Sequence, residues 1–122
     1  MPLQLTTAAV LALAATASAQ SVPLTSDTFD AEVIDVVRPS FLLFYAPWCG
    51  HCKALKPAWN EMAAEYQAST GVLIGEVDCT TNEDLCKEHD VEGYPELKFA
   101  ESGATELEDY EGEDRSAEGL VR

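Results

Sequence analysis

The chain has 122 residues, with 22 acidic side chains, 7 basic ones and a formal net charge of −15. This length fits one domain of ordinary size, and a hydrophobic fraction of 47% is enough for a packed interior, which argues against a disordered acidic tail. Because the excess negative charge repels phosphate backbones and anionic lipid headgroups, we expect neither nucleic-acid binding nor polybasic attachment to a membrane.

The first 19 residues are predicted to be a signal peptide. Residues 1–20 carry no charged side chain, include an apolar stretch over 8–15, and contain the small-x-small pattern Ala17-Ser18-Ala19. A helix of eight residues spans roughly 12 Å, too short for the ~30 Å core of a bilayer. A disordered leader is the alternative, since no Lys or Arg precedes the apolar stretch. We expect cleavage after Ala19 and one domain over residues 20–122 in which disulfides are permitted.

Helical and extended patterns then alternate. An N-cap cluster at residues 25–27 predicts a helix that ends before Pro39, with apolar residues at helical spacing: Phe29, Val33, Val36 and Val37. Residues 40–46 form an almost unbroken apolar run, typical of a strand buried on both faces. A helix follows from the first cysteine pair to about Ala68, and we expect Pro57 to kink it.

The second half continues the alternation. Residues 72–78 predict another buried strand, and Asn82 begins a short helix that ends near His89. Residues 96–100 and 105–110 predict a hairpin, and a last helix from Arg115 is cut off at the end of the sequence. This order predicts an α/β fold, with a central mixed β-sheet flanked by helices on both faces and the last helix truncated.

The chemistry is predicted to lie in Cys49-Gly50-His51-Cys52. At a helix N-terminus, unpaired N–H groups and the positive end of the helix dipole favour a thiolate over a thiol. A free thiol of pKa about 8.5 is only about 3% ionised at pH 7, whereas tuned thiols in such motifs have pKa values of roughly 3.5–7.5. His51 adds partial positive charge beside the sulfurs. We predict that Cys49 attacks substrate sulfur and that Cys52, one turn further in, resolves the mixed disulfide.

Other uses of these cysteines compete with the redox interpretation. A c-type haem site needs histidine directly after the second cysteine, where this chain has Lys53. A four-cysteine zinc site is disfavoured because Cys79 and Cys86 are too far apart in sequence to form a second close ligand pair. An inert disulfide between Cys49 and Cys52 stays open from the spacing alone.

The stretch Phe44-Tyr-Ala-Pro-Trp-Cys-Gly-His-Cys-Lys53 resembles the active-site segment of protein disulfide isomerases, a family of the thioredoxin superfamily. Pro57 matches that family's helix-kinking proline, and Gly93-Tyr94-Pro95 resembles the segment that carries its cis-proline. The resemblance covers nearly all of residues 22–122. It implies a thioredoxin fold, thiol–disulfide exchange on folding proteins, and residence in the lumen of the endoplasmic reticulum.

The resemblance also implies partners and a binding surface. Trp48, Tyr94 and Pro95 are expected to contact substrate, which would be unfolded or partly folded secretory proteins. A thiol oxidase or glutathione is the expected redox partner, and no cofactor, metal or membrane span is expected. Because the sequence carries no Lys-Asp-Glu-Leu-type retention signal, secretion is the alternative location.

Residue 43 and the spacing before Arg115 are among the departures of the chain from the family pattern. Leu43 stands where family members usually have a buried acid that relays a proton for the resolving cysteine. We therefore expect Cys52 to lie in a drier site, and the second half of the reaction to be slower. The alternative is that Leu43 simply packs the strand and that another group or water transfers the proton. Arg115 resembles a family arginine that modulates the pKa of Cys52, although an extra residue separates it from Gly112. A surface arginine paired with a nearby acid is the alternative.

Cys79 and Cys86 are predicted to form a structural disulfide. Cys79 follows a predicted strand and Cys86 lies on the helix after it, so the sulfurs can meet across the turn, as in some members of the family. Such a loop stabilises a fold by about 2–3 kcal/mol in the chain-entropy treatment. Two free thiols remain the alternative.

The leading functional hypothesis is a lumenal thiol–disulfide oxidoreductase or isomerase. The alternatives are a client-binding, chaperone-like thioredoxin module of low turnover and a truncated fragment of a larger disulfide isomerase.

Overall fold

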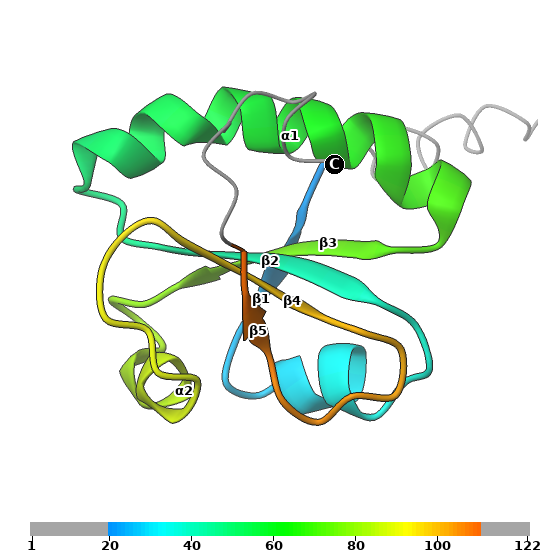
Figure 1. Ribbon diagram of the computed structural model, residues 1–122. Helices are drawn as coiled ribbons and strands as arrows, with labels where there is room; N and C mark the ends of the chain where they lie inside the picture. Colours follow the sequence, from blue (N-terminus) through cyan, green and yellow to red (C-terminus); the bar gives the residue numbers. More distant parts are fainter. Residues whose placement is uncertain (1–19, 111–122) are drawn as a thin grey trace, which may run out of the picture.

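In the computed structural model, which describes residues 20–110, five strands form one mixed sheet in the order β1-β3-β2-β4-β5 (Figure 1). β1 and β2 run parallel to β3, whereas β4 runs antiparallel to both β2 and β5. The strand bounds are Val22–Leu24 for β1, Ser40–Tyr45 for β2, Leu73–Asp78 for β3, Glu96–Ala100 for β4 and Glu108–Asp109 for β5.

Helices cover both faces of the sheet, as predicted. The long helix α1 (Gly50–Thr70) lies on one face. The short helix α2 (Glu83–Glu88) and the π-helical turn η2 (Asp30–Ile34) lie on the other (Figure 1). Within residues 20–110, no helix combines the length and the apolar character needed to cross a membrane. The predicted leader and the predicted last helix lie outside the described residues.

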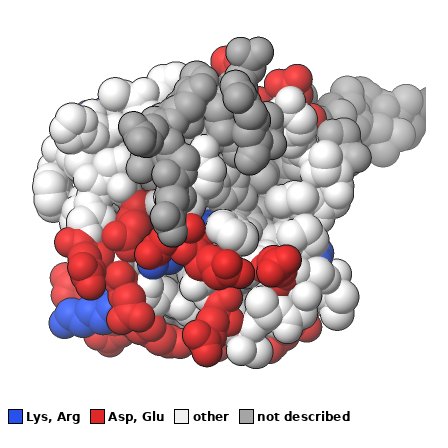
Figure 2. Space-filling view, in the orientation of Figure 1, with Lys and Arg blue, Asp and Glu red and all other residues white. Residues whose placement is uncertain are grey.

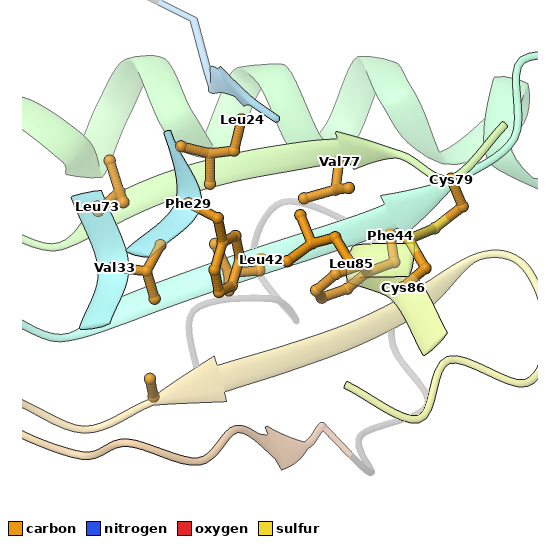
Figure 3. Packing of buried hydrophobic residues seen from close by; sticks show 11 residues of the cluster. Leu24, Phe29, Val33, Leu42, Phe44, Leu73, Val77, Cys79, Leu85 and Cys86 are labelled. Carbon is orange, nitrogen blue, oxygen red and sulfur yellow. A yellow bond between two sulfur atoms is a disulfide. The ribbon is translucent and has the colours of Figure 1, made fainter. Parts of the chain in front are cut away.

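The interior on the η2 and α2 side is built around the central strand β2. Leu42 and Phe44 alternate with Leu43, so they face this side while Leu43 faces α1. The buried cluster comprises Leu24, Phe29, Val33, Leu42, Phe44, Leu73, Val77, Cys79, Leu85, Cys86 and Ala100. Figure 3 shows these side chains converging on the sheet, with the sulfur–sulfur bond at one end of the cluster.

A second buried cluster joins the sheet to α1. Its members are Leu43, Leu55, Trp59, Met62, Ala63, Ile74 and Leu97. Trp59 is fully buried, and its ring lies 5.0 Å from that of Phe41, centroid to centroid. Because both faces of β2 are covered, the unbroken apolar run of this strand is explained by burial rather than by membrane insertion.

Strand β1 was not anticipated. It has only three residues, its central residue is Pro23, and a proline removes the N–H that a strand interior needs. Proline is tolerated because β1 lies at the edge of the sheet and pairs with β3 alone. Three residues are too few to show an alternation of apolar and polar side chains, so β1 forms only because it pairs with β3.

The helix predicted to run to Pro39 is wrong in type and length. Only a π-helical turn forms, closed by the hydrogen bond from the N–H of Asp35 to the carbonyl of Asp30 at 2.8 Å. Phe29 and Val33 are buried against the sheet, but Val37 is exposed on the connection to β2. Pro39 disfavours helical backbone angles only at the residue before it, so it does not account for the end of the turn at Ile34.

Asn82 precedes α2, but its side chain does not cap that helix. Its Oδ1 accepts a hydrogen bond from the N–H of Ser26 at 2.9 Å, and its Nδ2 donates to the carbonyl of Asp78 at 3.0 Å. Asn82 therefore ties the segment before η2 to the turn after β3, a long-range role that no local pattern reveals.

The predicted hairpin forms with a shorter second strand. Gly103 takes a φ of 84° in the turn, a conformation that favours glycine. β5 is held to β4 by backbone pairing and by the buried ammonium of Lys98, which lies 2.5 Å from a carboxylate oxygen of Asp109. The side chains of β5 are exposed and acidic, so they bury no apolar surface that would stabilise a longer strand.

Acidic side chains gather on one part of the surface. Figure 2 shows them crowded over the lower part of the molecule in this view, where Figure 1 places α2 and β5. Few basic side chains interrupt them there. This surface fits the expectation, drawn from the net charge, that polyanions are repelled.

We predict that Gly75→Ala destabilises the fold by about 1–3 kcal/mol, since an added Cβ would lie 2.7 Å from a side-chain carbon of Leu24 and overpack the β1–β3 contact. Gly93→Ala is the matched control, because its Cβ would meet nothing within 4 Å. Urea unfolding of both variants measures the difference, and equal midpoints would contradict this packing constraint.

Candidate active site

The two thiols of the Cys49–Cys52 segment lie where β2 gives way to α1. Cys49 is the N-cap residue of α1, with extended backbone angles, and Cys52 lies in the first turn. Both are free thiols, with exposed fractions of 9% for Cys49 and 1% for Cys52. They pack with Ala46 and the partly buried ring of Tyr45. Cys49 is therefore the more exposed of the two.

Hydrogen bonds lower the pKa of Cys49. The N–H and thiol groups of Cys52 and the N–H of His51 stabilise its thiolate, and they outweigh the opposing effect of burial. Its Sγ also lies 3.6 Å from the carbonyl oxygen of Tyr94. The N–H groups of His51 and Cys52 belong to the first turn of α1, where no carbonyl of a preceding helical turn is available to accept their hydrogen bonds. The thiolate of Cys49 is thus the better stabilised of the two.

The pKa of Cys52 is shifted in the opposite direction. Burial raises it to about 11, and the neighbouring Cys49 adds to the increase. The positive charge of Lys56 acts against the shift. A single turn of helix therefore separates an activated thiol from one that holds its proton.

The segment around Pro95 lies against the first sulfur. The Tyr94–Pro95 peptide bond is cis. A groove of about 390 Å³ is lined by His51, Ala54, Leu55 and Pro95. The rings of Trp48 and Tyr94, with exposed fractions of 69% and 37%, stand edge to face at 5.8 Å between centroids. The groove and the two rings thus belong to segments that adjoin Cys49 in sequence or contact its sulfur.

Leu43 is fully buried in the cluster that faces α1, so β2 supplies no carboxylate beside Cys52. Its partner in the register of β2 and β3 is Glu76. Arg115 lies outside the described residues.

Sequence reasoning missed a polar group beside Cys52, in which Lys56 and Tyr45 interact with the thiol and Glu76 interacts with both of them. Lys56 Nζ lies 2.8 Å from Glu76 Oε2 and 4.6 Å from the ring centroid of Tyr45. Two signals could have revealed them. Glu76 interrupts an apolar strand. Lys56 follows Cys52 by four residues, so Lys56 and Cys52 lie on the same face of a helix.

Cys79 and Cys86 are joined by a disulfide with an S–S distance of 2.06 Å. Both are buried in the cluster on the α2 side. Their thiols are therefore not available as zinc ligands. In the part of the chain described, no group of three or more His, Cys, Asp or Glu side chains is placed to hold a metal ion.

Comparison with known proteins identifies the family. The sequence matches the family described as Thioredoxin over residues 20–122. It is 44% identical over 104 residues to "Protein disulfide-isomerase-like protein EhSep2" of Emiliania huxleyi, covering 84% of this chain and 47% of that protein. It is 42% identical to "Protein disulfide-isomerase A4" of Homo sapiens over 96 residues, covering 78% of this chain and 15% of that protein. The chain spans less than half the length of these relatives.

Solved structures agree with the sequence comparison. The J-Trx1 fragment of ERdj5 matches with a TM-score of 0.71 at 38% identity, covering 82% of this chain and 47% of that one. The first thioredoxin domain of mouse protein disulfide-isomerase A4 matches with a TM-score of 0.70 at 34% identity, covering 81% of this chain and 69% of that one. The chain belongs to the thioredoxin family and has the thioredoxin fold. These relatives are named as a protein disulfide isomerase and as a protein similar to one.

We predict that iodoacetamide at pH 7 alkylates Cys49 and leaves Cys52 unmodified, because the pKa of Cys49 is lowered and that of Cys52 is raised to about 11. As the pH rises, the rate at Cys49 levels off above its pKa. The rate at Cys52 keeps rising towards pH 11, since its thiolate fraction grows with each pH unit. Peptide mass spectrometry measures both rates, and equal reactivity at pH 7 would contradict the assignment.

We predict that replacing Cys79 and Cys86 together by alanine lowers the free energy of unfolding by about 2–3 kcal/mol, as the unfolded chain regains the freedom of the closed loop. Urea unfolding measures the change. The alkylation rate of Cys49 serves as the control and should stay the same. An unchanged unfolding midpoint would mean that the bridge does not stabilise the fold.

Proposed function

We propose that this chain is a lumenal thiol–disulfide oxidoreductase or isomerase that acts on folding secretory proteins through its Cys49-Gly50-His51-Cys52 centre. The contrast between its two thiols carries the proposal, since the pKa of Cys49 is lowered whereas the less exposed Cys52 has a raised pKa and keeps its proton. Its relatives support it, because one is named as a protein disulfide isomerase and another as similar to one.

The two thiols act in sequence. In the reducing direction, the Cys49 thiolate attacks one sulfur of a client disulfide, and the other client sulfur leaves as a thiolate that takes a proton from water. Cys52 then loses its proton and attacks Cys49 Sγ, which breaks the bond to the client and forms the Cys49–Cys52 disulfide. The client gains two electrons and the chain loses two. The reverse sequence gives a disulfide to the client.

The proposed client surface surrounds the outer sulfur. The groove lined by His51 and Pro95 offers apolar contact, and the exposed rings of Trp48 and Tyr94 offer aromatic contact. These contacts depend little on sequence, which suits a protein that meets many partly folded chains. An extended client segment is proposed to lie along the Tyr94–Pro95 segment, next to the sulfur that it reacts with.

The proposed location is the lumen of the endoplasmic reticulum, with secretion as the alternative. The predicted signal peptide and the stable Cys79–Cys86 disulfide support an oxidising compartment. A thiol oxidase or glutathione is the proposed partner that resets the redox state of Cys49 and Cys52.

A client-binding module of low turnover is the second candidate. The observation that favours it is the pKa of about 11 at Cys52, because a resolving thiol that holds its proton lets mixed disulfides persist. The buried Leu43 supplies no acid on β2 to relieve this. The same surface would then bind client chains but exchange their disulfides only slowly.

We predict that a Cys52→Ser variant incubated with a scrambled, disulfide-containing client accumulates covalent adducts at Cys49, because no resolving thiol remains to release them. Mass spectrometry counts the adducts. In parallel, the unmodified chain should speed the reduction of insulin by dithiothreitol and the refolding of the scrambled client.

The outcomes separate the candidates. Adducts together with turnover support the oxidoreductase, whereas adducts without turnover support the client-binding module. A Cys49→Ser variant is the control and should give neither. If Cys52→Ser forms no adduct, both candidates are wrong.

A further inference from the structure

The resolving step poses a problem of proton transfer. Cys52 has an exposed fraction of 1%, and its pKa is raised to about 11 by burial. Bulk water therefore has little access to the thiol, and an isolated thiolate would be poorly solvated there. A group on the protein has to accept the proton if the step is to proceed near neutral pH.

Lys56 is placed to meet this need. It follows Cys52 by four residues on α1, so both side chains lie on one face of the helix, and its charge acts on the thiol. Its Nζ donates a hydrogen bond of 2.8 Å to Glu76 Oε2 and lies 4.6 Å from the ring centroid of Tyr45. Tyr45 in turn packs against the two cysteines. The ammonium is held in place rather than free in solvent.

Glu76 enters the same site from the neighbouring strand. On β3 it alternates with the backbone so that it shares a face with Ile74, which packs in the cluster under α1. Its exposed fraction is 12%, and its other oxygen accepts a hydrogen bond from the hydroxyl of Ser21. The register pairs it with Leu43 on β2. The Glu76 carboxylate is therefore on the strand next to β2, directly beside position 43, where this chain has an apolar leucine.

We propose that the Lys56–Glu76 pair accepts the proton of Cys52 in the resolving step, with Glu76 acting through Lys56 as its positioning residue. The inference rests on the function proposed above. It extends that function by naming residues of this chain that take the proton from the buried thiol.

The step balances without an external base. Lys56 takes the proton from Cys52 Sγ and passes one of its own protons along the hydrogen bond to Glu76 Oε2. The site begins with a thiol, an ammonium and a carboxylate, and it ends with a thiolate, an ammonium and a carboxylic acid. Its net charge stays constant, so no unpaired charge is created in the buried site. The thiolate then attacks Cys49 Sγ and expels the client thiolate.

Other charged groups face the pair and have to be included in its titration. From β2, the Tyr45 hydroxyl interacts with Glu76, and Asp78 at the end of β3 adds negative charge near that ring. From α1, Cys49 and Lys56 act on Cys52. Ser21, just before β1, contributes a hydrogen bond and no charge.

Two substitutions separate proton transfer from simple charge effects. Glu76→Gln keeps the shape but leaves the Lys56 cation unopposed, which by charge alone would stabilise the Cys52 thiolate and speed resolution. Lys56→Arg keeps the cation, but a guanidinium does not give up its proton in proteins. Proton transfer predicts that both variants are slower, whereas a pure charge effect predicts rates equal to or above that of the original chain.

The test follows a single turnover of the full, reduced chain with a saturating model peptide disulfide. Acid quenching at increasing times and mass spectrometry measure how fast the mixed disulfide at Cys49 disappears. We expect each variant to slow this step by about tenfold or more at pH 7. We also expect the rate of the original chain to depend less steeply on pH than the rate of Glu76→Gln. The Glu76→Gln rate should keep rising with pH, because hydroxide replaces the lost acceptor.

Matched controls exclude a general structural effect. Glu32→Gln removes the acid of the Arg38–Glu32 ion pair on η2, on the opposite face of the sheet, and should leave the rate unchanged. Thermal unfolding and the alkylation rate of Cys49 check that each variant is folded with an intact nucleophile.

If Glu76→Gln and Lys56→Arg resolve as fast as the original chain, with the same pH profile, the inference is overturned and the proposed function stands. If the original chain forms the mixed disulfide but never resolves it, the oxidoreductase function itself fails. A slower step and a changed pH profile in both variants support the proton path.

Discussion

The burial of β2 on both faces is the constraint on which the rest of the structure depends. Leu42 and Phe44 anchor it to the layer of η2 and α2, and Leu43 anchors it to α1. With both faces fixed, the end of the strand at Tyr45 has a defined position, and α1 has to begin within a few residues. This junction places Cys49 at the N-terminus of a helix that is itself held against the sheet. The reactivity of the first thiol therefore follows from packing several residues away.

The same burial creates the opposite state in the second thiol. The N–H groups of the first turn point toward Cys49 and lower its pKa, while the covered interior raises that of Cys52 to about 11. Disulfide exchange by two cysteines uses both states, since one cysteine attacks as a thiolate and the other stays protonated until it resolves the mixed disulfide. The apolar environment that protects the waiting thiol also hinders its deprotonation. Lys56 and Glu76, whose ion pair joins α1 to β3, are the groups proposed to accept its proton.

Local patterns predicted the elements that carry strong periodicity. The strands at β2 and β3 and the helix α1 were found within two residues of their observed bounds, because a buried apolar run and a motif at a helix start are local signals. The failures are elements that depend on partners. β1 is a strand only because β3 pairs with it around Pro23, and η2 is short because Phe29 and Val33 are fixed on the sheet before Pro39 is reached.

The sequence by itself determined the fold class. It also predicts the reactive segment Cys49–Cys52 and the roles of its two thiols, because spacing and helix position are local properties. The tertiary structure decided which charges surround Cys52. Lys56 and Glu76 are 20 positions apart, and only the docking of α1 on β3 brings them to 2.8 Å. It likewise brought Tyr94 to the sulfur of Cys49, 45 positions earlier in the chain. Electrostatics and solvent access act through space, so they became definite only after the chain had packed.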